Sequence, residues 1–280
     1  MKTLGYYNGK TGEADEIMIP FGDRSHWFGD GVYDAGPSRN YKLFAIDEHI
    51  ERFFNSAALM DIIIPKSKEE IKDLLYELVK KMDTGDNFVY IQCTRGGLGI
   101  RNHLYEKEPG NLWVMMTPQK VNEGLEPLKL ITAVDTRFFH CNCKTLNLLP
   151  SVQAAEEAKI KGCAEAILYR PNGRVTECAH SNCHIIKDGK LYTAPTDELI
   201  LPGIARAHMI RMAKKLGYGV SETPYNIKEV FDAEEVLVTS SSNPCLHANE
   251  VDGKTVGGKN HDMLENLRSH LVEELYDATE

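Results

Sequence analysis

The sequence has no long apolar run. Its apolar runs are short, such as residues 62–64, whereas a membrane-spanning helix needs roughly 18 consecutive apolar residues. The amino-terminal segment also lacks the apolar stretch that is typical of a secretion signal. These two absences predict a cytoplasmic protein that does not cross a membrane.

The sequence also lacks an excess of positive charge. Its 32 lysines and arginines are outnumbered by 41 aspartates and glutamates, which gives a formal net charge of −9. A protein that binds nucleic acid through its phosphates carries a basic face. The charge balance therefore argues against a nucleic-acid partner.

Cysteine is scarce, with seven residues in 280. An odd number of cysteines in a long chain without a secretion signal favours reduced thiols over a disulfide framework. Internal repeats and low-complexity segments are absent from the sequence. The hydrophobic fraction of 42% and the charged fraction of 26% are ordinary for a globular protein.

The length of the chain predicts about two domains, or one large domain. Both halves mix strand-like and helix-like segments, so the fold class is α+β or α/β. A polar stretch containing glycine and proline marks the expected boundary. We expect a small domain at 1–118, a linker at 119–127 and a larger domain at 128–280.

Local signals in the first half predict helices at two places. Apolar residues at helical spacing predict a helix capped by Asp47 and ending near Met60. Ser67 followed by Glu70 is a capping box and predicts the start of a second helix. The strands expected in this half are 32–35, 42–46, 87–94 and 112–117.

In the second half, turn residues predict two hairpins. The Asn172-Gly173 and Asp188-Gly189 pairs are strong hairpin signals, and Gly217 is an expected helix C-cap. The expected strands are 129–134, 164–169, 175–177, 183–186, 191–193 and 235–239, and the expected helices are 150–161, 205–216 and 261–276.

Three charged residues are candidates for chemistry. Lys144 is the single charge in an otherwise uncharged loop, where desolvation can favour the neutral amine that forms a Schiff base; the alternative is a lysine that snorkels to solvent. Glu177 could hold a cation or a protonated ring nitrogen, or could be an exposed turn carboxylate. Arg52 could grip a phosphate, or could pair with an acid on its own helix.

Two segments resemble anion cradles. Residues 201–205 lead directly into a predicted helix, whose free N–H groups and dipole favour a phosphate. Residues 239–242 end a predicted strand with four hydroxyl-bearing side chains. Neither signal is specific alone, because most helix starts bind water.

Cysteine and histidine gather in two places, and both residue types are zinc ligands. Neither spacing matches a CxxC pair or a zinc finger, and alternate residues of a strand face opposite ways. A metal-binding module is therefore a weak alternative, and a bystander role for the thiols is the default. The clusters are His140, Cys141 and Cys143, and Cys178, His180, Cys183 and His184.

Taken in order, the motifs resemble the fold-type IV pyridoxal-phosphate (PLP) enzymes. The resemblance covers nearly the whole chain, and it is closest to the D-amino acid aminotransferases. The motifs are FGDGVYD (28–34), DEHIERF (47–53), TRG (94–96), RNH (101–103), KTLNLL (144–149), EAILYRPNGRVTE (165–177), SN (181–182), LPGIAR (201–206) and VTSSS (238–242).

The resemblance implies an α+β fold, with a small amino-terminal domain and a larger domain that has a β-barrel-like core. It implies that Lys144 forms the aldimine with PLP and moves the proton, and that Glu177 pairs with the pyridine nitrogen. Leu201 would pack on the ring face. The phosphate would be held by Arg52, the backbone at Ile204 and Ala205, and the hydroxyls of Ser240 and Ser241.

The resemblance further implies that Tyr33, Arg101 and His103 bind the substrate carboxylate, the last two from the partner subunit of a homodimer. His180 departs from the serine-rich stretch of the D-specific enzymes, so it could contact cofactor or substrate. Residues 34–37 also differ from the family, which leaves the choice of substrate side chain open.

We therefore expect a ping-pong transamination of D-amino acids, with 2-oxoglutarate or pyruvate as acceptor. Three sibling activities are the alternatives: branched-chain aminotransferase, (R)-amine transaminase and aminodeoxychorismate lyase. A Cys/His metal-binding module is the alternative outside this class.

Overall fold

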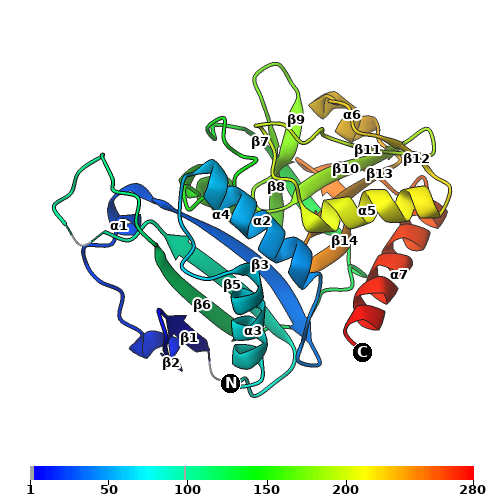
Figure 1. Ribbon diagram of the computed structural model, residues 1–280. Coiled ribbons are helices and arrows are strands. Elements are labelled where there is room, and N and C mark those ends of the chain that lie inside the picture. Colours follow the sequence, from blue (N-terminus) through cyan, green and yellow to red (C-terminus); the bar gives the residue numbers. More distant parts are fainter. Residues whose placement is uncertain (1–2, 98) are drawn as a thin grey trace. The chain divides into compact units, whose positions relative to one another are not determined.

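The computed structural model describes residues 3–97 and 99–280 (Figure 1). The chain folds as two compact units. Unit 1 comprises the residues up to Val121 together with Cys143–Asn147 and Tyr276–Glu280. Unit 2 comprises Asn122–Asn142 and Leu148–Leu275. No helix within the described residues is both long and apolar enough to span a membrane.

Unit 1 is built on a six-stranded sheet with the order β2-β1-β6-β5-β3-β4, in which every neighbouring pair is antiparallel. The central strands β3 and β5 pair along their length although they are far apart in the chain. The strands are β1 (Leu4–Tyr7), β2 (Lys10–Glu13), β3 (Gly31–Arg39), β4 (Lys42–Leu43), β5 (Asn87–Thr94) and β6 (Asn111–Pro118).

Two helices, α2 (Ile46–Leu59) and α3 (Lys68–Val79), cover one face of this sheet (Figure 1). Their apolar faces and the inward residues of the strands form a core that contains Val32, Phe53 and Leu78. Because successive strand residues face opposite sides, Val32 and Asp34 point to the helices, whereas Tyr33 points to the opposite face. Two short helical segments, η1 (Ala14–Glu16) and α1 (Ser25–Phe28), precede β3.

Unit 2 contains a nine-stranded mixed sheet with the order β12-β11-β10-β13-β14-β7-β8-β9, and β15 pairs with β14. The last strand in this order, β9, also contacts β10. The sheet therefore curls into a partial barrel around an apolar core. The strands are β7 (Leu128–Val134), β8 (Glu165–Tyr169), β9 (Val175–Cys178), β10 (Asn182–Lys187), β11 (Lys190–Thr193), β12 (Gly219–Ser221), β13 (Glu235–Ser240), β14 (Asn243–Val251) and β15 (Lys254–Thr255).

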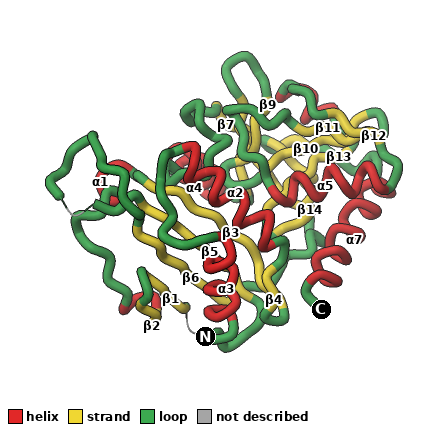
Figure 2. The backbone as a smooth tube through the Cα atoms, in the orientation of Figure 1, coloured by secondary structure: helices red, strands yellow, loops and turns green. Residues whose placement is uncertain are grey.

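Helices pack on the outside of this curled sheet, as the helices and strands of Figure 2 show. Helices α5 (Ile204–Lys215) and α7 (His261–Ala278) share an apolar cluster with β10, β11 and β13. Helix α4 (Leu149–Ile160) packs through its small residues Ala154 and Ala158 on β7 and β8. A short helix, α6 (Ile227–Asp232), precedes β13.

Most predicted elements are confirmed. The Ser67–Glu70 capping box is present, both predicted hairpins form, and Gly217 follows α5 with a left-handed φ of 83°. The strand predicted at 42–46 is wrong beyond Leu43. Ala45 adopts a left-handed conformation (φ 48°), which ends the extended run, and α2 begins at the next residue without a side-chain cap from Asp47.

Strand β14 is not among the strands expected from the sequence. It pairs with β13 on one side and with β7 on the other. Its alternation is interrupted by Asn243, Pro244 and a shift in register between Ala248 and Glu250. These interruptions hide the period of two on which strand prediction depends.

Candidate active site

In unit 1, Lys144 lies against the sheet beside β3. Its carbonyl oxygen accepts a hydrogen bond from the Tyr33 N–H (2.9 Å), and its own N–H donates to Ser56 Oγ (3.1 Å). The Lys144 Nζ lies 4.2 Å from the centre of the Tyr33 ring, which is stacked on Tyr90. The ammonium group is therefore held over an aromatic face, where cation–π attraction favours it.

Arg52 lies on α2 and pairs with Asp34 of β3. Its Nε donates to Asp34 Oδ2 and its Nη2 donates to Asp34 Oδ1, both at 2.8 Å. Asp34 Oδ1 also lies 2.7 Å from His49 Nδ1. Although burial favours the neutral acid, Arg52 and His49 hold the pKa of Asp34 well below its usual value.

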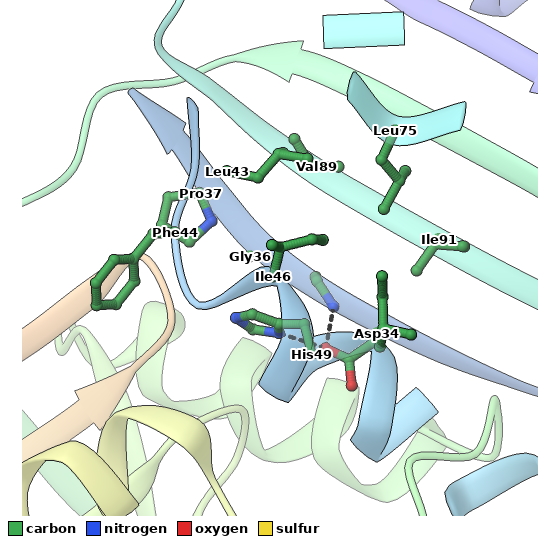
Figure 3. Close-up of a pocket in the computed structure, with 12 residues that line it drawn as sticks. Asp34, Gly36, Pro37, Leu43, Phe44, Ile46, His49, Leu75, Val89 and Ile91 are labelled. Carbon is green, nitrogen blue, oxygen red and sulfur yellow. Dashed lines mark hydrogen bonds and ion pairs between the residues drawn. The ribbon is translucent and has the colours of Figure 1, made fainter. Parts of the chain in front are cut away.

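Burial lowers the pKa of His49, and the charges of Arg52 and Lys144 add to this effect. His49 is therefore a neutral imidazole that donates from Nδ1 to the Asp34 carboxylate. Its Nε2 faces a small cavity lined by apolar side chains of β3, β4, β5, α2 and α3, and has no hydrogen-bond partner among the described residues (Figure 3). The network thus fixes the orientation of the Arg52 guanidinium.

The predicted carboxylate-binding residues Arg101 and His103 lie in an exposed loop of unit 1 and meet at one aromatic ring. The Arg101 guanidinium carbon lies 4.8 Å from the centre of the Phe28 ring, and the His103 ring centre lies 5.1 Å from it. Arg101 forms no ion pair with Glu106 or Glu108, all of which lie within the described residues. Arg101 and His103, two residues apart, therefore both pack against the Phe28 ring.

In unit 2, Glu177 is a buried carboxylate with three donors around it. Asn182 Nδ2 and the Leu201 N–H each donate to its Oε2 at 3.1 Å, and Arg137 Nη1 donates to its Oε1. The side chain is only 7% exposed, so the alternative of an exposed turn carboxylate does not hold. Neither Arg137 nor Asn182 is predicted from the sequence as a partner of Glu177.

Arg137 is itself fixed by a second acid. Its Nη2 donates to Asp135 Oδ2 at 2.9 Å, and Thr176 Oγ1 donates to the same oxygen at 2.7 Å. Burial opposes the charge on Arg137, but Glu177 and Asp135 raise its pKa further above the usual value. Arg137, held by Asp135, therefore orients the Glu177 carboxylate through an ion pair; we call this arrangement the Glu177 clamp.

Asn182 also connects Glu177 to the start of α5. The same Nδ2 donates to the Leu201 carbonyl at 3.1 Å. Gly203 is the N-cap of α5 and offers no side-chain hydrogen bond, so the first N–H groups of the helix, at Ile204 and Ala205, receive no side-chain cap. An uncapped helix start of this kind suits an anion.

The second predicted cradle, Ser240 and Ser241, lies where β13 ends. Asn243 Nδ2 donates to Ser240 Oγ at 2.8 Å, and both serines are half-buried. Thr239, directly before them, is bonded to the buried His184 through its Oγ1 and the histidine Nε2 (2.8 Å). Burial and the nearby charge of Arg206 lower the pKa of His184 to about 3, so this histidine is neutral.

His180 pairs with another acid, Glu165. Its Nδ1 lies 2.6 Å from Glu165 Oε2, and Ser181 Oγ donates to the same oxygen at 2.7 Å. The cysteines of both clusters are free thiols. Within residues 3–97 and 99–280, no group of three or more His, Cys, Asp or Glu side chains could hold a metal ion.

Each unit, taken by itself, has residues that fit a part of pyridoxal phosphate, the cofactor that the resemblance implies. Unit 2 offers an ionised clamp behind a buried carboxylate, which suits a ring nitrogen, and an uncapped helix start with nearby hydroxyls, which suits a phosphate. Unit 1 offers an amine held over an aromatic ring. The roles of these residues remain predictions.

Comparison with known proteins agrees with this chemistry. Residues 31–251 match the family described as amino-transferase class IV. A D-alanine aminotransferase of Listeria monocytogenes is 37% identical over 272 residues, which cover 95% of this chain and 94% of that protein. A D-alanine aminotransferase of Bacillus licheniformis is 34% identical over 285 residues, which cover 100% of this chain and 99% of that protein.

Solved structures agree on the fold. A branched-chain aminotransferase of the thermophilic archaeon Thermoproteus uzoniensis, solved with norvaline, has a TM-score of 0.88 at 21% identity and covers 99% of this chain and 97% of its own. The branched-chain amino acid aminotransferase of Escherichia coli has a TM-score of 0.89 at 20% identity, with coverages of 100% and 96%. At these identities the likeness establishes the fold.

Proposed function

Because this chain belongs to the amino-transferase class IV family, we propose that it is a PLP-dependent aminotransferase that moves the amino group of a D-amino acid to a 2-oxo acid. The acceptor is 2-oxoglutarate or pyruvate. The observation that carries the proposal is the Glu177 clamp, tied through Asn182 to the uncapped start of α5. The identities of 37% and 34% to D-alanine aminotransferases support the choice of D-amino acids.

PLP, when bound, supplies an aldehyde that captures amines and a ring that accepts the electron pair left by the α-proton. Lys144 Nζ would be the amine that holds the aldehyde end of the cofactor and the base that takes the α-proton of the substrate. Glu177 would hold a proton at the ring nitrogen, and Arg137 keeps the carboxylate in place. Leu201 would pack on the ring.

Hydroxyls, backbone N–H groups and a guanidinium would hold the phosphate. Ser240 and Ser241 supply hydroxyls, and the first N–H groups of α5 add the positive end of the helix dipole. Arg52 supplies a guanidinium whose orientation Asp34 fixes. These contacts would hold the cofactor independently of Lys144.

The substrate carboxylate is recognised by Tyr33, Arg101 and His103, the last two reaching the site of the partner subunit in a homodimer. The exposure of both basic side chains and their meeting at Phe28 support this role. His180, whose side chain is largely exposed, is a further contact for cofactor or substrate just beyond the end of β9.

Absorbance and covalent trapping test the proposal. The purified protein should be yellow, and borohydride should abolish the band and fix the cofactor on Lys144, as measured by peptide mass spectrometry. A panel of D- and L-amino acids and (R)-amines then separates D-amino acid transamination from the three sibling activities. A colourless protein that takes up no PLP would contradict the proposal.

Arg101→Leu tests the substrate class. We expect kcat/KM for D-alanine to fall by about one to two decades, because a hydrogen bond to a charged group is worth about 1.5–3 kcal/mol. An (R)-amine without a carboxylate should lose little activity or gain some. Arg211→Leu, which removes an exposed arginine of unit 2, is the control. Equal losses on both substrates would mean that Arg101 supports structure.

A further inference from the structure

Arg24 binds the backbone of the loop that carries Arg101 and His103 through three hydrogen bonds. Its Nη1 donates to the carbonyl oxygens of Asn102 (2.6 Å) and Leu104 (3.2 Å), and its Nη2 donates to the carbonyl of His103 (3.2 Å). One guanidinium thus holds three consecutive peptide carbonyls. The planar fork of five donors makes this possible for arginine, whereas an ammonium group is a single point of charge.

Arg24 is itself firmly placed. Its Nε donates to Asp30 Oδ2 at 2.7 Å, and its backbone N–H donates to the Gly96 carbonyl at 3.0 Å, at the start of the same loop. Only 11% of the side chain is exposed. The guanidinium is therefore oriented by a largely buried acid before it reaches the loop.

The loop at 96–110 has little regular secondary structure of its own. Within the described part of 96–110, no residue belongs to a helix or a strand. The three basic side chains Arg24, Arg101 and His103 all pack on Phe28, with guanidinium-to-ring-centre distances of 4.8 Å for both arginines. Phe28 ends α1, and Arg24 is the N-cap of that helix. Arg24 and α1 together form the platform on which the loop rests.

We propose that Arg24 is a positioning residue that holds segment 101–104, so that Arg101 and His103 face one substrate carboxylate together. This inference rests on the proposed function of Arg101 and His103. Without the guanidinium, the three carbonyls turn to water and the backbone between the two basic residues is free to rotate. The two side chains then no longer converge, and the substrate carboxylate loses a preorganised partner.

The expected consequence is a loss in substrate binding rather than in proton transfer. Arg24→Met should raise KM for D-alanine about tenfold or more and change kcat less than about threefold, because Lys144 and Glu177 are untouched. Turnover of a carboxylate-free (R)-amine should change less than about twofold. Arg24→Lys, which keeps the charge but loses the fork, should give an intermediate KM.

The matched control is Arg39→Met. Arg39 also lies in unit 1, donates to a backbone carbonyl (Thr279, 3.5 Å) and stacks on an aromatic ring (Tyr276, 4.0 Å), but it touches a different segment. Loop order is measured separately with a glutamate-specific protease, which should cut after Glu106 about tenfold faster in Arg24→Met than in the wild type or in Arg39→Met.

Two results would overturn the proposal. One is a KM for D-alanine that Arg24→Met and Arg39→Met change equally, and the other is a proteolysis rate that Arg24→Met leaves unchanged. If Arg24→Met does not fold, Arg24→Lys decides by the same two measurements. A wild-type enzyme that turns over no D-amino acid contradicts the proposed function instead, and proteolysis then decides the loop-holding role alone.

Discussion

The position of Lys144 depends on hydrogen bonds of its backbone and not on its side chain. Tyr33 and Ser56 bind its carbonyl and N–H groups, so removal of the side chain should leave the segment in place. We expect Lys144→Ala to stay folded and to lose turnover by a factor of about 10²–10⁴ or more, the usual contribution of a general acid–base group. Steady-state assays without added amine measure the turnover, and circular dichroism measures whether the variant is folded. An active variant would contradict the assignment.

Glu177→Gln separates the electronic role of the carboxylate from its structural role. The amide can still accept from the Leu201 N–H, but it cannot hold a ring-nitrogen proton as a carboxylate can. We expect PLP to bind, since the phosphate groups are unaffected, and the half-reaction with D-alanine to slow by about tenfold or more in rapid mixing. Asp197→Asn, which weakens an ion pair with Arg174 in the same unit, is the control. Wild-type rates would rule out the role.

At the residue scale, the sequence predicts the side chains that would carry the chemistry but not the residues that orient them. Glu177 stood out by motif, whereas Arg137 lies 40 residues away in the chain and carries no local signal. Asp34 was noted as a departure from the family, yet its pairing with Arg52 depends on the packing of α2 on β3. Such partners follow from tertiary contacts, which spacing alone does not encode.

At the element scale, the start of α5 depends on the space at Gly203. Its φ of −66° suits any residue, so the glycine is required for room and not for conformation. A Cβ there would overlap Asn182 Oδ1, and the same side chain donates to Glu177. The helix start and the Glu177 clamp are therefore one packed unit.

Gly203→Ala should destabilise the protein by about 1–3 kcal/mol, the usual cost of overpacking, and weaken PLP binding. Urea unfolding and PLP titration measure these effects. Because the two sites share one contact, Asn182→Ala/Gly203→Ala should be little worse than Asn182→Ala alone. Gly99→Ala, where an added Cβ meets nothing within 4 Å, is the neutral control. Additive losses in the double variant would contradict the shared contact.

Elements with local signals were predictable, and those without them were not. The Ser67 capping box and the Asn-Gly and Asp-Gly turns act through neighbouring residues, so the sequence alone predicts them. The end of β4 depends on the left-handed backbone of Ala45, a conformation that alanine rarely adopts and that tertiary packing imposes.

At the scale of the whole molecule, buried histidines couple stability to pH. His184 has its pKa lowered to about 3, mainly by burial, so the folded protein keeps it neutral while the unfolded chain binds a proton below about pH 6.5. The unfolded state then holds more protons, and stability falls as the pH drops from about 6.5 toward 3. The slope from this residue approaches about 1.4 kcal/mol per pH unit.

His184→Gln should reduce this decline. Urea unfolding at about pH 6 and about pH 5 should show the wild type losing about 1 kcal/mol more than the variant over that unit. His49, also buried and with a lowered pKa, contributes equally to both proteins and cancels. His261→Gln, which removes a histidine with a side chain 75% exposed, should follow the wild type. Parallel declines in all three proteins would show that His184 does not set this dependence.

The order in which the units can be completed follows from the segments that make up unit 1. Its last pieces are Cys143–Asn147 and Tyr276–Glu280, and the second of these buries Thr279, whose carbonyl accepts from Asn40 Nδ2 (3.1 Å). A ribosome adds about 5–20 residues per second, so roughly 7–27 s separate the synthesis of Asn147 from that of Glu280. During that time the amino-terminal sheet exists without its final partners, while most of unit 2 is being made. The nascent chain thus closes its first-made unit last.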